Sequence, residues 1–236
     1  MKILCLIPAY NERGNLTELV EKLHRELLIE KVDFKILFIL QGNDGSRQLL
    51  DKLKKIYPKI NYLYQPKPLG IGQAYQLGFN NLDKNYSHIL TLDADLNHQP
   101  SEIKKLITAW KKTNCDIIIG SRFIAGGHFK DRRLWKRLSS SLINKLIRNY
   151  FKINVYDISS GFRLIKREVI ENVRGKLKEK GYPAYMELIL LARKFGASIS
   201  EVPISYIPRK WGKSKMNKLK TSLDYLSLLL RVFFNF

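Results

Sequence analysis

Apolar runs and helical repeats of apolar residues alternate along the first half of the chain. Residues 3–7 form a continuous apolar run that ends at Pro8, which is typical of a strand buried on both faces. Apolar residues then recur every three or four positions from Leu16 to Leu27, which predicts an amphipathic helix. The same patterns predict strands at 34–40, 60–64, 88–92 and 117–119, and helices at 46–55, 72–80 and after Pro100. This alternation predicts an α/β fold with a mostly parallel sheet.

The second half of the chain lacks this regular alternation. From Ser121 onward the sequence is basic and irregular, which favours loops and isolated helices, so we place a boundary near residue 121. Residues 1–121 would form an α/β half, and residues 122–236 a basic half of the same domain. Near the C-terminus the spacing of apolar residues predicts an amphipathic helix, which contains Met216, Leu219, Leu223, Leu226, Leu230 and Phe233. Its last twelve residues, 225–236, are too few to span a bilayer but suited to lie on one.

The amino-acid composition limits the classes of protein to which the chain can belong. With 45% hydrophobic and 27% charged residues in 236, the chain has the composition of a folded globular protein. No run approaches the ~18 to 20 consecutive apolar residues that a membrane span needs, and the N-terminus does not resemble a signal peptide. We therefore expect a cytoplasmic protein. Cys5 and Cys115 are the only cysteines, which excludes a disulfide framework and a cysteine-based zinc site.

Charge is distributed unevenly along the chain. The 42 Lys and Arg residues exceed the 21 Asp and Glu residues and give a formal net charge of +21. Residues 1–120 carry a net charge of only +4, whereas residues 121–236 carry +17. Residues 122–152 hold nine basic residues, and residues 209–220 hold six without an acid. The second half is therefore expected to face a nucleic acid, an anionic membrane or a phosphorylated substrate.

Candidate binding residues follow the predicted strands, where open α/β sheets bind their ligands. Residues 8–12 (PAYNE) offer an aromatic ring for stacking on a base and a carboxylate, although they also fit a simple turn before a helix. Residues 69–75 are rich in glycine before a helix, which lets the backbone approach a ligand. The four histidines lack metal-ligand spacing, and we expect them to be structural: His24, His88, His98 and His128.

The most specific of these strand ends is the one after residues 88–92. Asp93 and Asp95 place two carboxylates at positions i and i+2, and Asn97 adds an amide. If the backbone turns here, these oxygens converge in a set that suits Mg²⁺ or Mn²⁺ bound to a diphosphate. The alternative is that they cap the helix that starts near Pro100.

Together these motifs resemble those of the family 2 inverting glycosyltransferases, specifically the dolichol-phosphate mannose synthases. The resemblance extends over nearly the whole chain and is carried, in order, by residues 8–12, 69–75, 93–96, 120–122, 160–163, 201–204 and 209–216. It implies a GT-A fold, a divalent metal ion (Mg²⁺ or Mn²⁺) and a nucleotide-sugar donor.

The resemblance also implies roles for individual residues. The nucleoside would be bound by Pro8, Tyr10, Glu12, Ile39 and Gln41. The metal ion and the donor diphosphate would be bound by Asp93, Ala94, Asp95, Asn97 and Arg122, with Arg209 and Lys215 closing over the donor. Lys136 and Arg137 fall near a position that binds the acceptor phosphate, and Glu187 matches a family carboxylate of open role.

The sequence departs from this family after the second strand. The family usually has two aspartates there, and this chain has Leu40 and Gln41. An amide can both donate and accept a hydrogen bond, so the base can still bind, but the charge-assisted bonds of a carboxylate are lost. We therefore expect an altered base preference.

The function that best joins these observations is transfer of a sugar, mannose from GDP-mannose, to a polyprenyl phosphate at a membrane surface. A phosphate monoester is largely dianionic at pH 7 and needs no general base, which agrees with the lack of a recognisable catalytic His or Glu pair. The basic segments and the apolar C-terminal helix would dock the enzyme on an anionic membrane. The sequence leaves open a separate membrane-anchoring subunit.

Three alternatives remain at this point. The first is a related transferase that uses UDP-glucose or another sugar. The second is a nucleic-acid-binding protein, which the charge would allow but for which no recognisable motif is present, so that we expect no nucleic-acid partner. The third is an adaptor at a membrane that no longer binds a donor, because Leu40 and Gln41 replace the usual aspartates.

Overall fold

The computed structural model describes residues 1–130, 134–212 and 217–235, without the side chains of 134–137, 139, 218 and 233–235. Seven strands of this part of the chain form one sheet in the order β3-β2-β1-β4-β7-β5-β8. Their bounds are β1 Lys2–Tyr10, β2 Asp33–Gln41, β3 Ile60–Gln65, β4 His88–Thr91, β5 Ile117–Ser121, β7 Arg163–Lys166 and β8 Ile199–Pro203. The strands pair in parallel except β7, which runs antiparallel to both β4 and β5. A second, two-stranded parallel sheet joins β6 (His128–Phe129) to β9 (Ser205–Tyr206).

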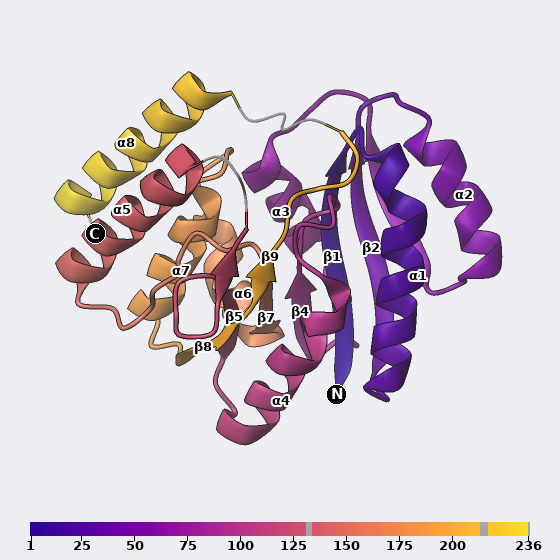
Figure 1. Cartoon of the computed structure of the whole chain (residues 1–236), viewed down its shortest axis with the longest axis horizontal. Helices are drawn as coiled ribbons and strands as arrows, with labels where there is room; N and C mark the ends of the chain where they lie inside the picture. The colour runs from indigo at the N-terminus through magenta and orange to yellow at the C-terminus, as the bar shows by residue number, and fades with distance from the viewer. Residues whose placement is uncertain (131–133, 213–216, 236) are drawn as a thin grey trace.

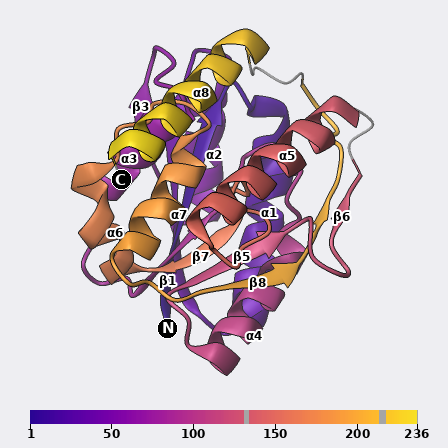
Figure 2. The same cartoon turned by 90° about the vertical axis from the view of Figure 1, so that its left-hand side faces the viewer.

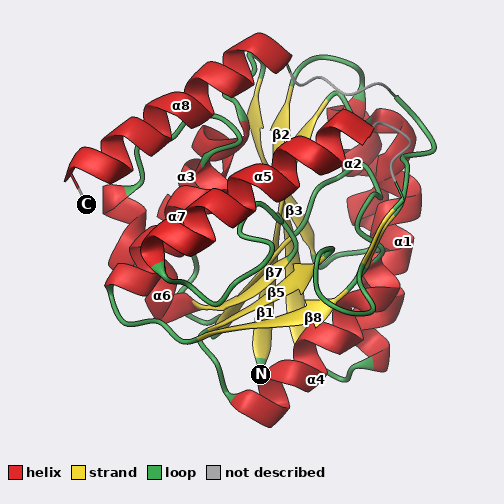
Figure 3. Cartoon of the chain, turned by 60° about the vertical axis from the view of Figure 1, so that its left-hand side comes forward, coloured by secondary structure: helices red, strands yellow, loops and turns green. Residues whose placement is uncertain are grey.

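Helices cover both faces of the large sheet (Figure 1). One face packs against α1 (Arg13–Ile29), α2 (Ser46–Ile56) and α4 (Ile103–Thr113), which follows the short 3₁₀ helix η1 (Pro100–Glu102). The other face packs against α3 (Ile71–Asn80), α6 (Arg167–Val173), which runs on into the 3₁₀ helix η2 (Arg174–Lys176), and α7 (Ala184–Lys194). Two long helices, α5 (Leu134–Phe151) and α8 (Lys218–Asn235), lie side by side outside α7 (Figures 1 and 3). The chain therefore has a layered α/β fold, as its sequence predicts.

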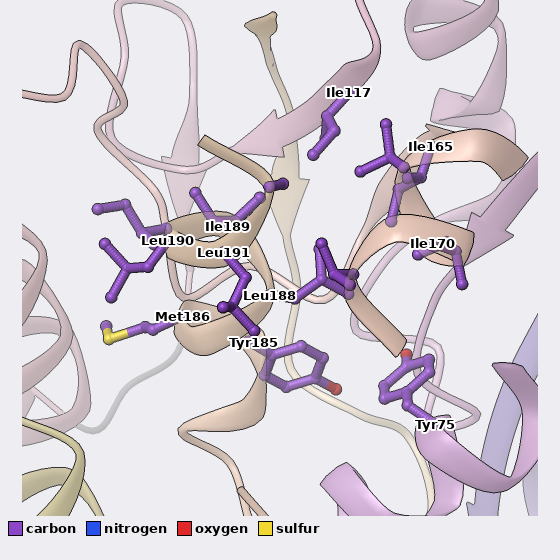
Figure 4. Close-up of a cluster of buried hydrophobic side chains, with 14 of the residues drawn as sticks. Tyr75, Ile117, Ile165, Ile170, Tyr185, Met186, Leu188, Ile189, Leu190 and Leu191 are labelled. Atoms are coloured by element: carbon purple, nitrogen blue, oxygen red, sulfur yellow. The ribbon is translucent and has the colours of Figure 1, made fainter. Parts of the chain in front are cut away.

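Helix α7 is the centre of the second hydrophobic layer. Residues 184–192 of this helix are all buried, because the sheet lies on one side of it and α5 and α8 cover the other. Figure 4 shows this helix next to Ile117 and Ile165 of the sheet, Ile170 of α6 and Tyr75 of α3. A helix that is apolar on all sides is expected to be buried in this way.

The first half of the chain follows the sequence prediction, whereas the second half differs from it. Each strand and helix predicted before residue 121 is present, with bounds that differ by a few residues. After that point the irregular pattern favoured loops and isolated helices, yet β7 and β8 belong to the same sheet as β1 to β5. The two halves of the sequence thus build one sheet together.

The predicted C-terminal helix is α8, but its apolar stripe points away from the core. Four of the predicted leucines are between 50% and 74% exposed: Leu219, Leu223, Leu226 and Leu230. The core instead receives Leu228 and Val232 from this helix. Met216 and the side chain of Phe233 lie outside the described part of the chain. No helix in the described residues is both long and apolar enough to span a membrane.

Glu187 connects α7 to α8 and to the segment 177–180. Its side chain is 3% exposed and accepts hydrogen bonds from the backbone N–H groups of Lys178 (2.9 Å) and Glu179 (2.8 Å). It also accepts from Nη2 of Arg231 on α8 at 2.7 Å, and Arg231 contacts the Glu179 carboxylate at 2.7 Å. The role of Glu187 that the sequence left open is therefore at least a structural one.

Segment 177–180 packs in turn against the start of α3. The carbonyl oxygen of Lys180 accepts a hydrogen bond from the backbone N–H of Gly72 at 2.8 Å. A Cβ atom at Gly72 would lie 2.3 Å from the Glu179 carbonyl oxygen and 2.8 Å from Cβ of Ala184. A side chain at position 72 would therefore push two backbone segments apart.

We predict that Gly72→Ala destabilises the protein by about 1 to 3 kcal/mol, because an overpacked site must shift its neighbours. Gly175→Ala is the matched control, since a Cβ atom there meets nothing within 4 Å. Urea unfolding of both variants measures the effect. Equal unfolding midpoints for the two variants would contradict the close contact at Gly72.

Candidate active site

A cavity of about 740 Å³ lies at the carboxyl ends of β1, β2 and β4 and extends toward α5 and α8. It gathers most of the residues that the sequence pointed to. The predicted residues that line it are Pro8, Tyr10, Glu12, Gln41, Asp93, Ala94, Asp95, Arg122 and Arg209. Segments that are distant in the sequence thus meet at one site.

Two predicted residues lie elsewhere. Ile39 is fully buried in the hydrophobic core, because it lies two residues deeper in β2 than Gln41 and is covered there. Asn97 is 2% exposed and lies behind Asp95: its backbone N–H bonds to Oδ1 at 3.0 Å and its Nδ2 to Oδ2 at 2.9 Å. Asn97 therefore orients Asp95 and does not line the cavity.

Three further predicted residues cannot be placed. Lys215 lies outside the described residues. Lys136 and Arg137 belong to the first turn of α5, where the side chains are outside the description.

Asp93 and Asp95 form the acidic part of the cavity. Both follow the end of β4 at Thr91. The hydroxyl of Tyr185 on α7 donates to Oδ1 of Asp93 at 2.7 Å, and Nη2 of Arg209 donates to Oδ2 of Asp95 at 2.6 Å. Each carboxylate is thus held by a residue about a hundred positions away in the chain.

The pKa values of these two carboxyl groups are raised. Burial raises the pKa of Asp95, and the neighbouring Asp93 raises it further. Burial also raises the pKa of Asp93, although the hydrogen bond from Tyr185 and the charge of Arg209 act in the opposite direction. A cation in the cavity would therefore stabilise the ionised pair.

The carboxylate pair fits a hard divalent cation only in part. Carboxylate oxygens are the ligands that Mg²⁺ and Mn²⁺ prefer. Within residues 1–130, 134–212 and 217–235, however, no three His, Cys, Asp or Glu side chains are grouped to hold a metal ion. A metal ion bound here would take its remaining ligands from a substrate or from water, as Mg²⁺ commonly does.

His98 also lines the cavity, which the sequence did not predict. It is 2% exposed and lies between Phe162 and Tyr206, with Nδ1 3.8 Å from Oδ2 of Asp93. Burial lowers the pKa of His98 to about 4, so the ring is neutral at pH 7. Neither ring nitrogen has a hydrogen-bond partner in the described part of the chain. The packing of the ring between two aromatic residues agrees with a structural histidine, although the described residues do not satisfy its nitrogens.

The end of the cavity next to β1 and β2 is shaped by Tyr10, Glu12 and Gln41. Helix α1 begins at Arg13, directly after Glu12. Asn15 is buried in its first turn and donates from Nδ2 to the Glu12 carboxylate at 2.6 Å. Asn15 therefore fixes a cavity residue.

Arg122 is held rigidly beside the carboxylates. Its Nε and Nη2 atoms both donate to the buried Asp157 carboxylate at 2.7 Å, and Nη2 also donates to Ser159 at 2.9 Å. Burial alone would raise the pKa of Asp157, but Arg122 reverses this and lowers it. The guanidinium also lies 4.9 Å from the ring centre of Phe129. This fixed cation is suited to bind a phosphate group.

The opposite end of the cavity lies between α5 and α8 and is more apolar. It is lined there by Ile143 of α5 and by Tyr225, Leu226 and Leu229 of α8. One continuous cavity thus joins a pair of carboxylates and a fixed arginine to a more apolar end.

Comparison with known proteins shows the family to which this chain belongs. Residues 5–174 match the model of glycosyl transferase family 2. The chain belongs to this family. It is therefore a glycosyltransferase, and the resemblance seen in its sequence is confirmed.

Two curated relatives are similar over most of their length. Polyprenol monophosphomannose synthase of Mycolicibacterium smegmatis is 34% identical over 221 residues, which cover 92% of this chain and 81% of that protein. Undecaprenyl-phosphate mannosyltransferase of Micrococcus luteus is 28% identical over 220 residues, which cover 92% and 88%.

Solved structures confirm the GT-A fold. Glucosyl-3-phosphoglycerate synthase of Mycobacterium tuberculosis in complex with UDP has a TM-score of 0.66 at 16% identity and covers 96% of this chain and 79% of its own. The same enzyme with Mn²⁺ and UDP-glucose has a TM-score of 0.66 at 14% identity, with coverage of 98% and 77%. At this level of identity the similarity concerns the fold.

We predict that Tyr185→Phe shifts the acid limb of the pH–activity profile of this glycosyltransferase to higher pH. The lost hydrogen bond stabilises the ionised form of Asp93, so its removal raises the pKa of Asp93 and protonates it at a higher pH. Tyr86→Phe, the same chemical change outside the cavity, is the control. An acid limb that coincides with the wild type would show that Asp93 need not be ionised.

Proposed function

We propose that the protein transfers mannose from a nucleoside diphosphate mannose, GDP-mannose, to a polyprenyl phosphate at the surface of a membrane. The names of the two curated relatives support this substrate class. The observation that carries the proposal is the single cavity with a polar end at Asp93 and Asp95 and an apolar end between α5 and α8. A phosphate with a long apolar tail fits a cavity of this kind.

At the polar end, Asp93 and Asp95 would hold a divalent cation together with the donor diphosphate. Related folds are known with Mn²⁺ and UDP-glucose, which supports Mn²⁺ or Mg²⁺ as the metal. The metal supplies charge stabilisation to the departing nucleoside diphosphate. Arg209, which contacts Asp95 in this structure, would provide a positive charge next to the diphosphate.

At the centre of the cavity, Arg122 would bind the acceptor phosphate. The phosphate is mostly dianionic at pH 7, so attack on the sugar carbon C1 needs no general base. The chain must instead offset the repulsion between the acceptor phosphate and the donor diphosphate. Arg122 is anchored for this purpose, and we propose that Lys136 and Arg137 at the start of α5 assist it. Attack opposite the leaving diphosphate inverts the configuration at C1.

At the apolar end, α5 and α8 would rest on the membrane. Besides the leucines of α8, a second stripe on α5 is 49% to 67% exposed: Leu138, Leu142, Leu146 and Tyr150. Figure 2 shows the two helices next to each other on one side of the molecule. The sequence segments that contain or adjoin the two stripes, 122–152 and 209–220, are rich in Lys and Arg. Apolar stripes flanked by Lys and Arg are typical of helices that lie in an anionic membrane surface.

We predict that Asp95→Asn lowers metal-dependent binding of GDP and the rate of transfer by roughly a hundredfold or more, because a charged metal ligand is lost. Titration calorimetry with GDP, with and without Mn²⁺, and an assay with undecaprenyl phosphate measure both effects. Asp33→Asn, which alters an exposed carboxylate paired with surface lysines, is the control. Wild-type turnover of Asp95→Asn in the presence of a chelator would exclude the metal site.

We predict that the protein binds vesicles of phosphatidylglycerol and phosphatidylcholine, and that salt weakens this binding. The combined substitution of Leu142, Leu146, Leu223 and Leu230 by Ser should lower the affinity at least roughly tenfold, since these side chains are already exposed and can only lose insertion.

Leu28→Ser with Ile29→Ser is the matched control for this test, because these residues are equally exposed at the end of α1, away from α5 and α8. Vesicle sedimentation measures the binding. Equal binding to neutral and anionic vesicles, or equal losses in both variants, would contradict this docking surface.

A further inference from the structure

The side-chain amide of Gln41 has a defined orientation. Gln41 is the last residue of β2 and is 3% exposed. The backbone N–H of Leu69 donates to its Oε1 atom at 2.7 Å. Because a backbone N–H can only donate, the atom that faces it must be the amide oxygen. The contact therefore assigns the oxygen and the nitrogen of this amide.

The amide nitrogen is the group that Gln41 has left for a ligand. Gln41 lines the cavity together with Tyr10 and Glu12. Among the residues that the structure describes, the bond from Leu69 to Oε1 is the one hydrogen bond of this side chain. Although an amide in general can donate and accept, this one is thus restricted to donating into the cavity.

Rotation of the amide would not restore an acceptor at low cost. A half turn would place Nε2 against the Leu69 N–H, so that two donors would face each other and the bond between them would be lost. The backbone of Gln41 is also fixed, because its carbonyl oxygen accepts from Asn11 at 3.1 Å and it pairs with Tyr10 and Gln65 in the sheet. The orientation is therefore part of the fold.

We infer that Gln41 recognises the nucleobase of the donor through an acceptor atom, a carbonyl oxygen such as O6 of guanine or O4 of uracil. This inference rests on the proposed function, in which the nucleoside lies beside Gln41. A carboxylate at this position would instead accept from the N1–H and N2–H groups of guanine. Gln41 gives no such bond, so this residue does not distinguish guanine from bases that lack the 2-amino group.

The substitution Gln41→Glu replaces the hydrogen-bond donor of this side chain by an acceptor, with little change in the shape of the side chain. The glutamate retains an oxygen toward the Leu69 N–H and places a second oxygen where Nε2 was. Gln65→Glu is the matched control, because Gln65 is the neighbour of Gln41 in β3 and does not line the cavity. It introduces the same charge nearby without facing the base.

The test compares GDP with IDP, which lacks only the 2-amino group of guanine, by titration of the full chain in the presence of Mn²⁺. We expect the wild type and Gln65→Glu to bind the two nucleotides within roughly threefold of each other. Gln41→Glu should bind GDP at least roughly tenfold more tightly than IDP, since one charge-assisted hydrogen bond corresponds to that factor or more. UDP should lose affinity relative to GDP in the same variant.

The outcomes separate this inference from the proposed function. A tenfold preference of the wild type for GDP over IDP, or a GDP to IDP ratio that Gln41→Glu leaves unchanged, overturns the inference alone. Failure of the wild type to bind any of the three nucleotides overturns the proposed function as well. Thermal unfolding of each variant verifies that the affinities refer to folded protein.

Discussion

The repulsion between two neighbouring carboxylates determines how the rest of the site is built. Asp93 and Asp95 face the same cavity, and burial makes the ionised form of each less favourable. Two negative charges persist in such a place only when cations and hydrogen-bond donors surround them. Arg209 and Tyr185 supply these contacts from the far end of the chain. The two carboxylates, which come from the first half of the chain, are thus held by residues of the second half.

The basic residues in the second half of the chain serve more than one function. Arg122 is paired with Asp157 and is fixed in one position, whereas α5 and α8, which carry exposed apolar stripes, lie in or next to basic segments of the sequence. Arg163 is different again: it is 1% exposed, donates to the carbonyl oxygen of Ile158 and lies 5.5 Å from the ring centre of Tyr185. Burial lowers the pKa of Arg163 to about 10, so it stays charged at pH 7. The basic residues of the second half therefore have several separate roles.

The parts of the fold that the sequence predicts are those with a local cause. A parallel strand buried on both faces appears in the sequence as a continuous apolar run, so β1 and β2 could be predicted. Ligand-binding residues directly follow such strands, so they could be predicted as well. Strand β7 was not predicted because its first residue is the buried Arg163, whose burial depends on Tyr185 and other distant groups. The apolar stripe of α8 was read correctly, but the pattern alone does not say whether a stripe faces the core or the outside.

The same distinction applies to the site. Asp93 and Asp95 were predicted from their spacing, whereas the contact of Tyr185 with Asp93 joins residues 92 positions apart and has no local signal. Asp157 has a weak sequence signal, because it is an acidic residue that follows a long basic stretch. The direction of the Gln41 amide depends on one backbone N–H group at Leu69, which no sequence pattern indicates.

The ion pairs of Arg231 give α8 a mechanical connection to the interior. Arg231 contacts Glu187 and Glu179, and the adjacent Lys180 carbonyl oxygen holds the first turn of α3 beside the cavity. A shift of α8 along its axis would therefore be transmitted through two short polar contacts to the glycine-rich turn. The helix that presents leucines to the outside is thus joined, through these contacts, to the turn before α3 that lines the cavity.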